Sequence, residues 1–152
     1  MMEIFNVATI MVAGLMVGTE LAIAVFVHPT LDRLPDAAHL PVATALARLL
    51  GKVMPFWYAL TLLLTLAEAL IDGHASGRWP VGTVAAAILW ALAIGYSLIA
   101  LVPVNNRIAA WTEGNPPADW KTYRSRWDGH HRWRVALLTL ALALLIAGTI
   151  SK

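Results

Sequence analysis

A polar stretch from Tyr123 to Arg134 carries the residue types most suited to chemistry, and it leads directly into an apolar segment. His130 and His131 are adjacent in it, and either can act as a base because the unperturbed pKa of histidine lies near neutrality. Trp127 can stack on a flat ring, and Arg134 shares a helix face with His131. The same residues would also form an aromatic and cationic belt at a membrane surface, which is the simpler interpretation of this stretch by itself.

One acidic residue, Glu20, interrupts the first apolar segment, residues 4–27. We expect that helix to end at His28, which puts Glu20 roughly 12 Å inside it at 1.5 Å per residue. An unpaired carboxylate in hydrocarbon costs on the order of 3 kcal/mol, so Glu20 is expected to contact water, a cation or a donor inside the bundle. Arg134 is the nearest cation, and His131 lies on its face. Glu20 would then orient the histidine or act as a base itself; the alternative is a glutamate that only fixes helix packing.

Four further residues are candidates for binding a substrate: Tyr96, Asn105, Asn106 and Arg48. Tyr96 is expected at the same depth as Glu20 and in the same pocket, unless it is a core tyrosine bonded to a backbone carbonyl. These residue types supply a base and hydrogen-bond donors. The candidate catalytic residues are His131, His130 and Glu20.

The elements that position these residues are four apolar segments, 4–27, 53–71, 81–104 and 130–150. The chain is 59% hydrophobic and only 13% charged, whereas soluble proteins are about a quarter charged. Because a membrane helix needs about 20 apolar residues, we predict an all-α integral membrane protein. The expected fold is a four-helix antiparallel bundle in one domain, residues 1–152. No basic stretch precedes the first segment, which is therefore expected to be a helix and not a signal peptide.

Proline and glycine mark the expected connections. Three prolines predict a polar loop over residues 28–41, and two glycines with a proline predict a short hairpin connection over 72–80. The third connection, 108–125, is broken at 114–117, and its Trp111 and Trp120 are expected to lie at the membrane interface.

Two features inside the spans bear on packing. Glu68 lies near the end of its span, so we expect it at the membrane interface. Gly14 and Gly18 form a small-x-x-x-small pair that favours close approach of another helix. A homo-oligomer that packs through this face is therefore an open alternative to a monomer.

The basic residues divide unequally between the two sides of the expected bundle. Only Arg78 and Lys152 lie on one side, whereas the other carries nine: Arg33, Arg48, Lys52, Arg107, Lys121, Arg124, Arg126, Arg132 and Arg134. The positive-inside rule then predicts that the first and third connections are cytoplasmic and that both termini are non-cytoplasmic, in the inner (cell) membrane. A net charge of only +2 favours no nucleic-acid partner. The expected partners are the lipid bilayer and a lipophilic small molecule. Since the chain contains no cysteine, thiolate sites are excluded.

Several short motifs resemble those of one known family: Pro29-Thr30-Leu31, Met54-Pro55, Asn105-Asn106-Arg107, Trp120, Arg124, Arg126-Trp127, His131 and Arg134. Over nearly the whole chain, the sequence resembles the anthrone-oxygenase-like family of small four-helix membrane proteins. Most members have no assigned role, and the few with one oxidise anthrone-type polyketides to anthraquinones without a metal or a flavin. The resemblance implies a cofactor-independent monooxygenase with no metal and no cofactor. Such a reaction requires a base for an acidic aromatic substrate, a dry apolar pocket and donors for the oxyanion.

Two other classes of function stay open. A haem or metal redox module could use His28 with His130 or His131, although the Glu-x-x-His spacing of di-iron bundles is absent. We expect no haem, because His28 precedes a proline where the chain should turn. The third class is a membrane scaffold or a carrier of a lipophilic ligand.

Overall fold

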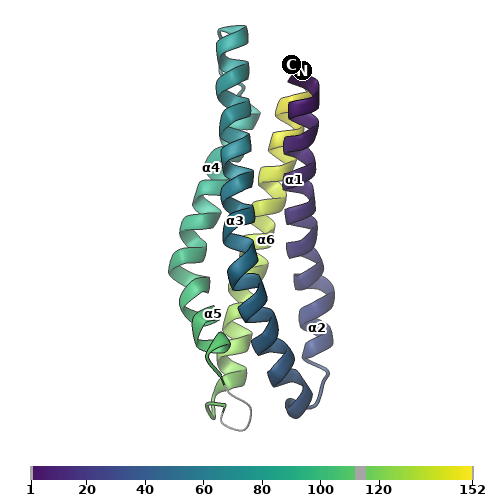
Figure 1. The fold of residues 1–152 in the computed structure, drawn as a ribbon, viewed down its shortest axis with the longest axis vertical. Coiled ribbons are helices and arrows are strands. Elements are labelled where there is room, and N and C mark those ends of the chain that lie inside the picture. Colours follow the sequence, from purple (N-terminus) through teal and green to yellow (C-terminus); the bar gives the residue numbers. More distant parts are fainter. Residues whose placement is uncertain (1, 112–115, 152) are drawn as a thin grey trace.

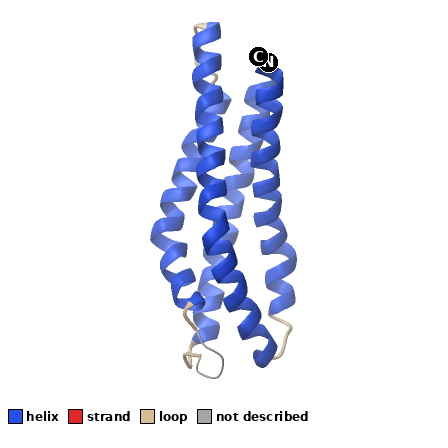
Figure 2. Cartoon of the chain, in the orientation of Figure 1, coloured by secondary structure: helices blue, strands red, loops and turns tan. Residues whose placement is uncertain are grey.

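The protein is a bundle of helices that lie along one long axis (Figure 1). The computed structural model describes residues 2–111 and 116–151, so the expected break at Gly114-Asn115 and the terminal Lys152 lie outside the described residues. Within them every regular element is a helix, and loops are confined to the ends of the bundle (Figure 2). Both ends of the chain lie together at one end of the bundle (Figure 1). The predicted all-α class is confirmed.

The first helical segment contains a wide turn where the sequence predicted an end. It consists of α1 (Met2–Ala22), a π-helical turn (Ile23–Val27) and α2 (His28–Leu31). The backbone N–H of His28 bonds the carbonyl of Ile23, five residues back. Pro29 lacks an N–H and its ring would clash with the carbonyl four residues earlier, and the π turn lets the helix continue past it. The predicted polar loop over residues 28–41 is therefore wrong, because helix continues to Leu31 and resumes at residue 36.

The third helical segment uses the same device. It consists of α4 (Val81–Tyr96), a π-helical turn (Ser97–Leu101) and α5 (Val102–Ala109). The N–H of Val102 bonds the carbonyl of Ser97, directly before Pro103. Hence this helix, too, extends beyond the predicted end of its span at residue 104.

The other two helices are also longer than their predicted spans. α3 (Asp36–Ser76) continues through Pro41 and Pro55, and it ends at Gly77, whose φ of 67° is the left-handed conformation that favours glycine. α6 (Trp120–Ile150) begins well before residue 130. Each of the four helical segments is long and apolar enough to cross a membrane.

The core on the side of the chain ends packs α1, α3, α4 and α6 around Met16, Trp90 and Leu138. Two of these helices, α4 and α6, approach closely at Gly82 and Gly148, where a Cβ on Gly82 would lie 2.7 Å from the Cα of Gly148. By contrast, a Cβ on Gly14 or Gly18 would have no neighbour within 4 Å among the described residues. Within one chain, the small-residue contact is thus made by α4 and α6 and not by α1.

Three polar or aromatic residues expected at the interface are instead buried. Glu68 is 1% exposed and accepts a hydrogen bond from the hydroxyl of Thr149 on α6, because α3 continues two turns beyond it. Trp111 and Trp120 pack against each other in a second core at the opposite end of the bundle. Glu68 is covered by α6, and the two tryptophans cover each other, so packing between segments buries all three side chains.

Candidate functional site

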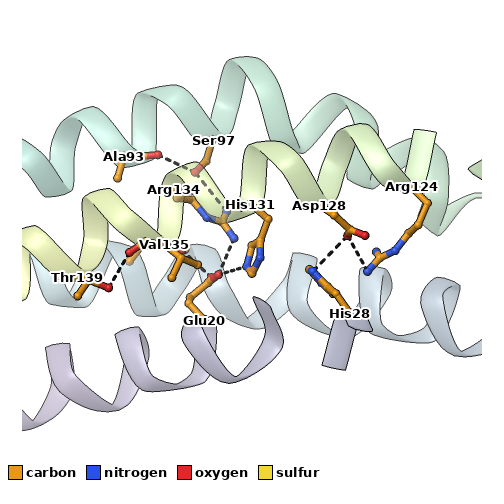
Figure 3. A network of polar contacts seen from close by, with 11 residues as sticks. Glu20, His28, Ala93, Ser97, Arg124, Asp128, His131, Arg134, Val135 and Thr139 are labelled. Carbon is orange, nitrogen blue, oxygen red and sulfur yellow. Dashed lines mark hydrogen bonds and ion pairs between the residues drawn. The ribbon is translucent and has the colours of Figure 1, made fainter. Parts of the chain in front are cut away.

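Four side chains from three helices meet at the carboxylate of Glu20, and we call Glu20, Tyr58, His131 and Arg134 the Glu20 cluster. The Tyr58 hydroxyl donates to Glu20 Oε1 at 2.6 Å, and Arg134 Nη2 donates to Oε2 at 2.8 Å. His131 Nε2 lies 2.5 Å from the same Oε2. Glu20 is 1% exposed and His131 is fully buried. Figure 3 shows Glu20 reaching from α1 toward His131 and Arg134, both on α6. The predicted contacts of Glu20 with a cation and a histidine are present.

The hydrogen bonds define what His131 can do. An ionised Glu20 that already accepts from Tyr58 and Arg134 also favours a proton on His131 Nε2, because a carboxylate is only an acceptor. A neutral His131 then carries its lone pair on Nδ1, which has no hydrogen-bond partner within the described part of the chain. Such a carboxylate–imidazole pair can take a proton on the free nitrogen while the carboxylate stabilises the imidazolium.

Neighbouring groups fix the orientation of the cluster. The Trp127 ring stacks on the His131 ring at a centroid distance of 4.8 Å and an angle of 11°. Arg134 Nη1 donates to Ser97 Oγ at 3.3 Å, and its guanidinium lies over the Tyr58 ring. Ser97 in turn donates to the carbonyl of Ala93 (Figure 3). Each reactive side chain is thus held by a second contact.

The Glu20 cluster lies at the polar side of a cavity of about 310 Å³, which we call the apolar cavity. This volume is at the lower end of the range for small-molecule sites. Its polar lining consists of Glu20, Tyr58, Ser97, Asn105, Asn106, Trp127, His131 and Arg134. Its apolar lining includes both π turns, through Ile23, Leu98 and Leu101. Since Pro55 and Leu98 line it and are also exposed, the cavity reaches the apolar surface between α3 and the third helical segment.

Six of the nine predicted site residues line the apolar cavity: Glu20, Asn105, Asn106, Trp127, His131 and Arg134. The cavity lining does not include Tyr96, His130 or Arg48. The Tyr96 hydroxyl lies 2.6 Å from His130 Nδ1, so these two side chains contact each other instead. Arg48 donates to the carbonyls of Ala109 and Trp111 and thereby caps the end of α5.

Helix geometry explains the two misplaced aromatic residues. Adjacent residues on a helix point about 100° apart around the axis, from 3.6 residues per turn. Ser97 therefore lines the cavity where Tyr96 was expected, and His131 lines it where His130 was an alternative.

Sequence reasoning missed Tyr58 and Ser97 as members of the site. The signal for Tyr58 was the same as for Glu20, since each is a polar side chain inside an apolar span. Met54, one turn before Tyr58 and part of a motif that resembles the family, also lines the cavity. Ser97 gave no usable signal, because a serine can bond a carbonyl of its own helix, as it does here with Ala93.

A second buried polar group adjoins the cluster. His28 Nδ1 lies 3.2 Å from Asp128 Oδ1, and Arg124 Nη2 lies 3.0 Å from the same oxygen (Figure 3). The expectation that the ring of His28 is poorly fixed at a turn is wrong: it is 1% exposed and its ring lies 4.9 Å from that of His131.

The arrangement does not fit the haem alternative. The rings of His28 and His131 contact each other directly, which leaves no space for an iron porphyrin between them. His130 is engaged with Tyr96. Among the described residues, no group of three or more His, Asp or Glu side chains is arranged to hold a metal ion.

The fold and the site define a class of protein, a small multi-pass helical membrane protein with a buried carboxylate–imidazole pair beside an apolar cavity. The family model described as anthrone oxygenase matches residues 52–144, more than half of the 152-residue chain. The protein therefore belongs to the anthrone oxygenase family, as its motifs predicted. The match includes Tyr58, His131 and Arg134, and Glu20 lies before it. No curated protein and no solved structure matches the chain.

Proposed function

We propose that the protein is a cofactor-independent oxygenase that acts on a flat, lipophilic, anthrone-type substrate within the membrane. The observation that carries the proposal is the Glu20–His131 pair, buried at the polar side of an otherwise apolar cavity. A base beside a dry apolar space is what the deprotonation of an acidic aromatic ring and its reaction with dioxygen require. The family supports the same reaction class.

In this proposal His131 begins the reaction by taking a proton from the methylene carbon of the substrate. The carbanion gives an electron pair to dioxygen in one-electron steps and forms a C–O bond, and the resulting peroxide takes a proton from His131. Removal of the second C–H proton breaks the O–O bond, so the carbon becomes a carbonyl and hydroxide leaves with that proton as water. The carbon loses four electrons and dioxygen gains four, so methylene plus dioxygen gives carbonyl plus water.

The other side chains of the cavity supply charge and orientation. Glu20 stabilises the imidazolium of His131 while the proton rests there. The guanidinium of Arg134, which also lines the cavity, favours negative charge on the bound ring. Asn105 and Asn106 also line the cavity and carry amide donors, and Trp127 presents an aromatic face. The bound substrate therefore meets one base and several donors in a site lined mainly by hydrocarbon.

We further propose an antiparallel bundle in one domain, with its first and third connections in the cytoplasm and both termini outside. The common position of the two chain ends (Figure 1) and the nine-to-two division of basic residues support this orientation. The exposed apolar edge of the cavity, at Pro55 and Leu98, would then face lipid and admit a lipophilic substrate from the bilayer.

The test is turnover of an anthrone by the purified protein in lipid nanodiscs, measured as quinone absorbance above the rate without protein. Wild type should accelerate the reaction, and Glu20→Gln and His131→Ala should each abolish the acceleration. His130→Ala is the matched control, since His130 contacts Tyr96 and does not line the cavity. Equal turnover in wild type and His131→Ala would contradict the proposal, and binding without any turnover would favour a carrier.

A further inference from the structure

A second pocket lies at the end of the bundle where α6 begins, and its character is opposite to that of the apolar cavity. This polar pocket has a volume of about 450 Å³, and it is lined by charged side chains from α6, from the start of α3 and from the connection between α2 and α3. Asp32, Asp36 and Lys121 line it and are exposed, so water enters it. Asp128 also lines it but is buried, and it therefore forms the inner wall.

Two buried side chains connect this polar pocket with the proposed base. Asp128 lines the polar pocket, His131 lines the apolar cavity, and His28 contacts both of them. The first contact is the 3.2 Å distance between His28 Nδ1 and Asp128 Oδ1, and the second is the 4.9 Å distance between the two imidazole centroids. Figure 3 shows these residues in one row from Asp128 to Glu20.

We propose that Asp128 and His28 form a proton relay that exchanges protons between water in the polar pocket and His131, an inference that rests on the proposed function. Neither residue touches the substrate, because neither lines the apolar cavity. The ring separation brings the two imidazoles into van der Waals contact. In the proposed transfer the His28 ring turns toward His131, whose own ring stays held by Glu20 and Trp127. His131 Nδ1, which has no hydrogen-bond partner in the described part of the chain, is the atom that receives or returns the proton.

The charged groups around His28 carry both signs, which suits a residue that passes a proton on and does not itself stay charged. The charge of Glu20 acts on it from α1, and those of Arg124, His131 and Arg132 act from α6. Asp128, also on α6, contacts it directly. Asp32, from the connection after α2, faces Asp128. Because Arg124 pairs with Asp128, the carboxylate at the entrance is held in position beside His28.

The function of the relay is to exchange the proton on His131 with water, a step that the proposed reaction does not include. That reaction releases no net proton, but His131 must be neutral at the start of every turnover. A bound lipophilic substrate fills the apolar cavity and blocks water on that side. The relay lets His131 equilibrate with water from the polar side while the substrate is bound.

Deuterium wash-out tests this proposal separately from oxidation. An anthrone deuterated at its methylene carbon is incubated with the protein in nanodiscs without oxygen, and loss of deuterium to water is followed by mass spectrometry. Wild type should wash out the label faster than nanodiscs alone. His28→Phe and Asp128→Asn should lower this rate by about 100-fold, the lower end of the contribution of a positioned proton-transfer group. Their oxidation rate in oxygen should fall far less, because the proton held by His131 returns to the peroxide.

His39→Phe is the matched control, since His39 is another buried histidine that lines the polar pocket, where it packs against Trp120. It should exchange deuterium at the wild-type rate. If His28→Phe does not fold, His28→Gln and the nearly isosteric Asp128→Asn decide the question.

The outcomes separate the two proposals. A wild-type protein that neither exchanges nor oxidises the substrate overturns the proposed function. Wild-type exchange in both relay variants overturns the relay and leaves His131 as the base. An equal loss of exchange and oxidation also overturns the relay, because it shows that His28 and Asp128 only hold the site together.

Discussion

The buried ion pair between Glu20 and Arg134 makes a quantitative prediction about stability. Arg134 Nη2 lies 2.8 Å from Glu20 Oε2, and the side chains are 10% and 1% exposed. Glu20→Gln leaves the guanidinium without its counter-charge, and Arg134→Met, of similar length, leaves the carboxylate with only His131 and Tyr58. Breaking a buried ion pair on one side costs about 3–5 kcal/mol in free energy of unfolding.

The double variant should cost less than the sum of the two single variants, because it strands no charge. We expect a coupling free energy of about 1–3 kcal/mol, as for residues in direct contact. The assay is equilibrium unfolding in mixed detergent micelles, followed by tryptophan fluorescence, for the wild type, both single variants and the double variant.

An exposed ion pair supplies the control. Lys121 Nζ lies 2.8 Å from Asp36 Oδ1, but the side chains are 68% and 62% exposed. Lys121→Met should therefore change the free energy of unfolding by less than about 0.5 kcal/mol. Strictly additive costs for Glu20→Gln and Arg134→Met, or a cost for Arg134→Met as small as that of Lys121→Met, would refute the reasoning.

Three further predictions concern the cavity, the helix packing and the orientation in the membrane. Tyr58→Phe removes a donor to Glu20 and should lower anthrone turnover, whereas Tyr96→Phe, the same change outside the cavity lining, should not; turnover assays of the two variants check this. Gly82→Ala should destabilise the bundle by about 1–3 kcal/mol because its Cβ would overlap Gly148, while Gly14→Ala, with open space around it, should not destabilise it in the same unfolding assay. A reporter fused after Lys152 should be active only outside the cytoplasm, and cytoplasmic activity would reverse the proposed orientation.

The fold was predictable because four long apolar segments admit few arrangements, but the helix ends were not. Proline was expected to end the first helix at residue 28 and the third near residue 104. The structure instead passes Pro29 and Pro103 through π turns, whose wider hydrogen bonds tolerate the missing donor. Local sequence does not distinguish a helix that stops at proline from one that continues, because packing against neighbouring helices decides between them.

The core of the site was predictable from the free-energy cost of burying a charged group in hydrocarbon. A carboxylate in hydrocarbon needs a partner, and this argument led from Glu20 to Arg134 and His131, which contact it. Which residue of a helix faces the cavity was less predictable, because Ser97 lines it where Tyr96 was expected. The positions of Arg48 and His28 were predicted wrongly for a further reason. The contacts that fix these two side chains come from segments distant in the chain, near Ala109 and at Asp128.

The most direct measurement of the central claim is the origin of the oxygen atom in the product. Purified protein treated with a metal chelator is incubated in nanodiscs with an anthrone and ¹⁸O₂, and the quinone formed above the protein-free rate is analysed by mass spectrometry. A cofactor-independent oxygenase predicts one ¹⁸O atom in the new carbonyl and protein-dependent formation that the His131→Ala variant loses. Loss of the protein-dependent rate after chelation, or its persistence in His131→Ala, would contradict the account.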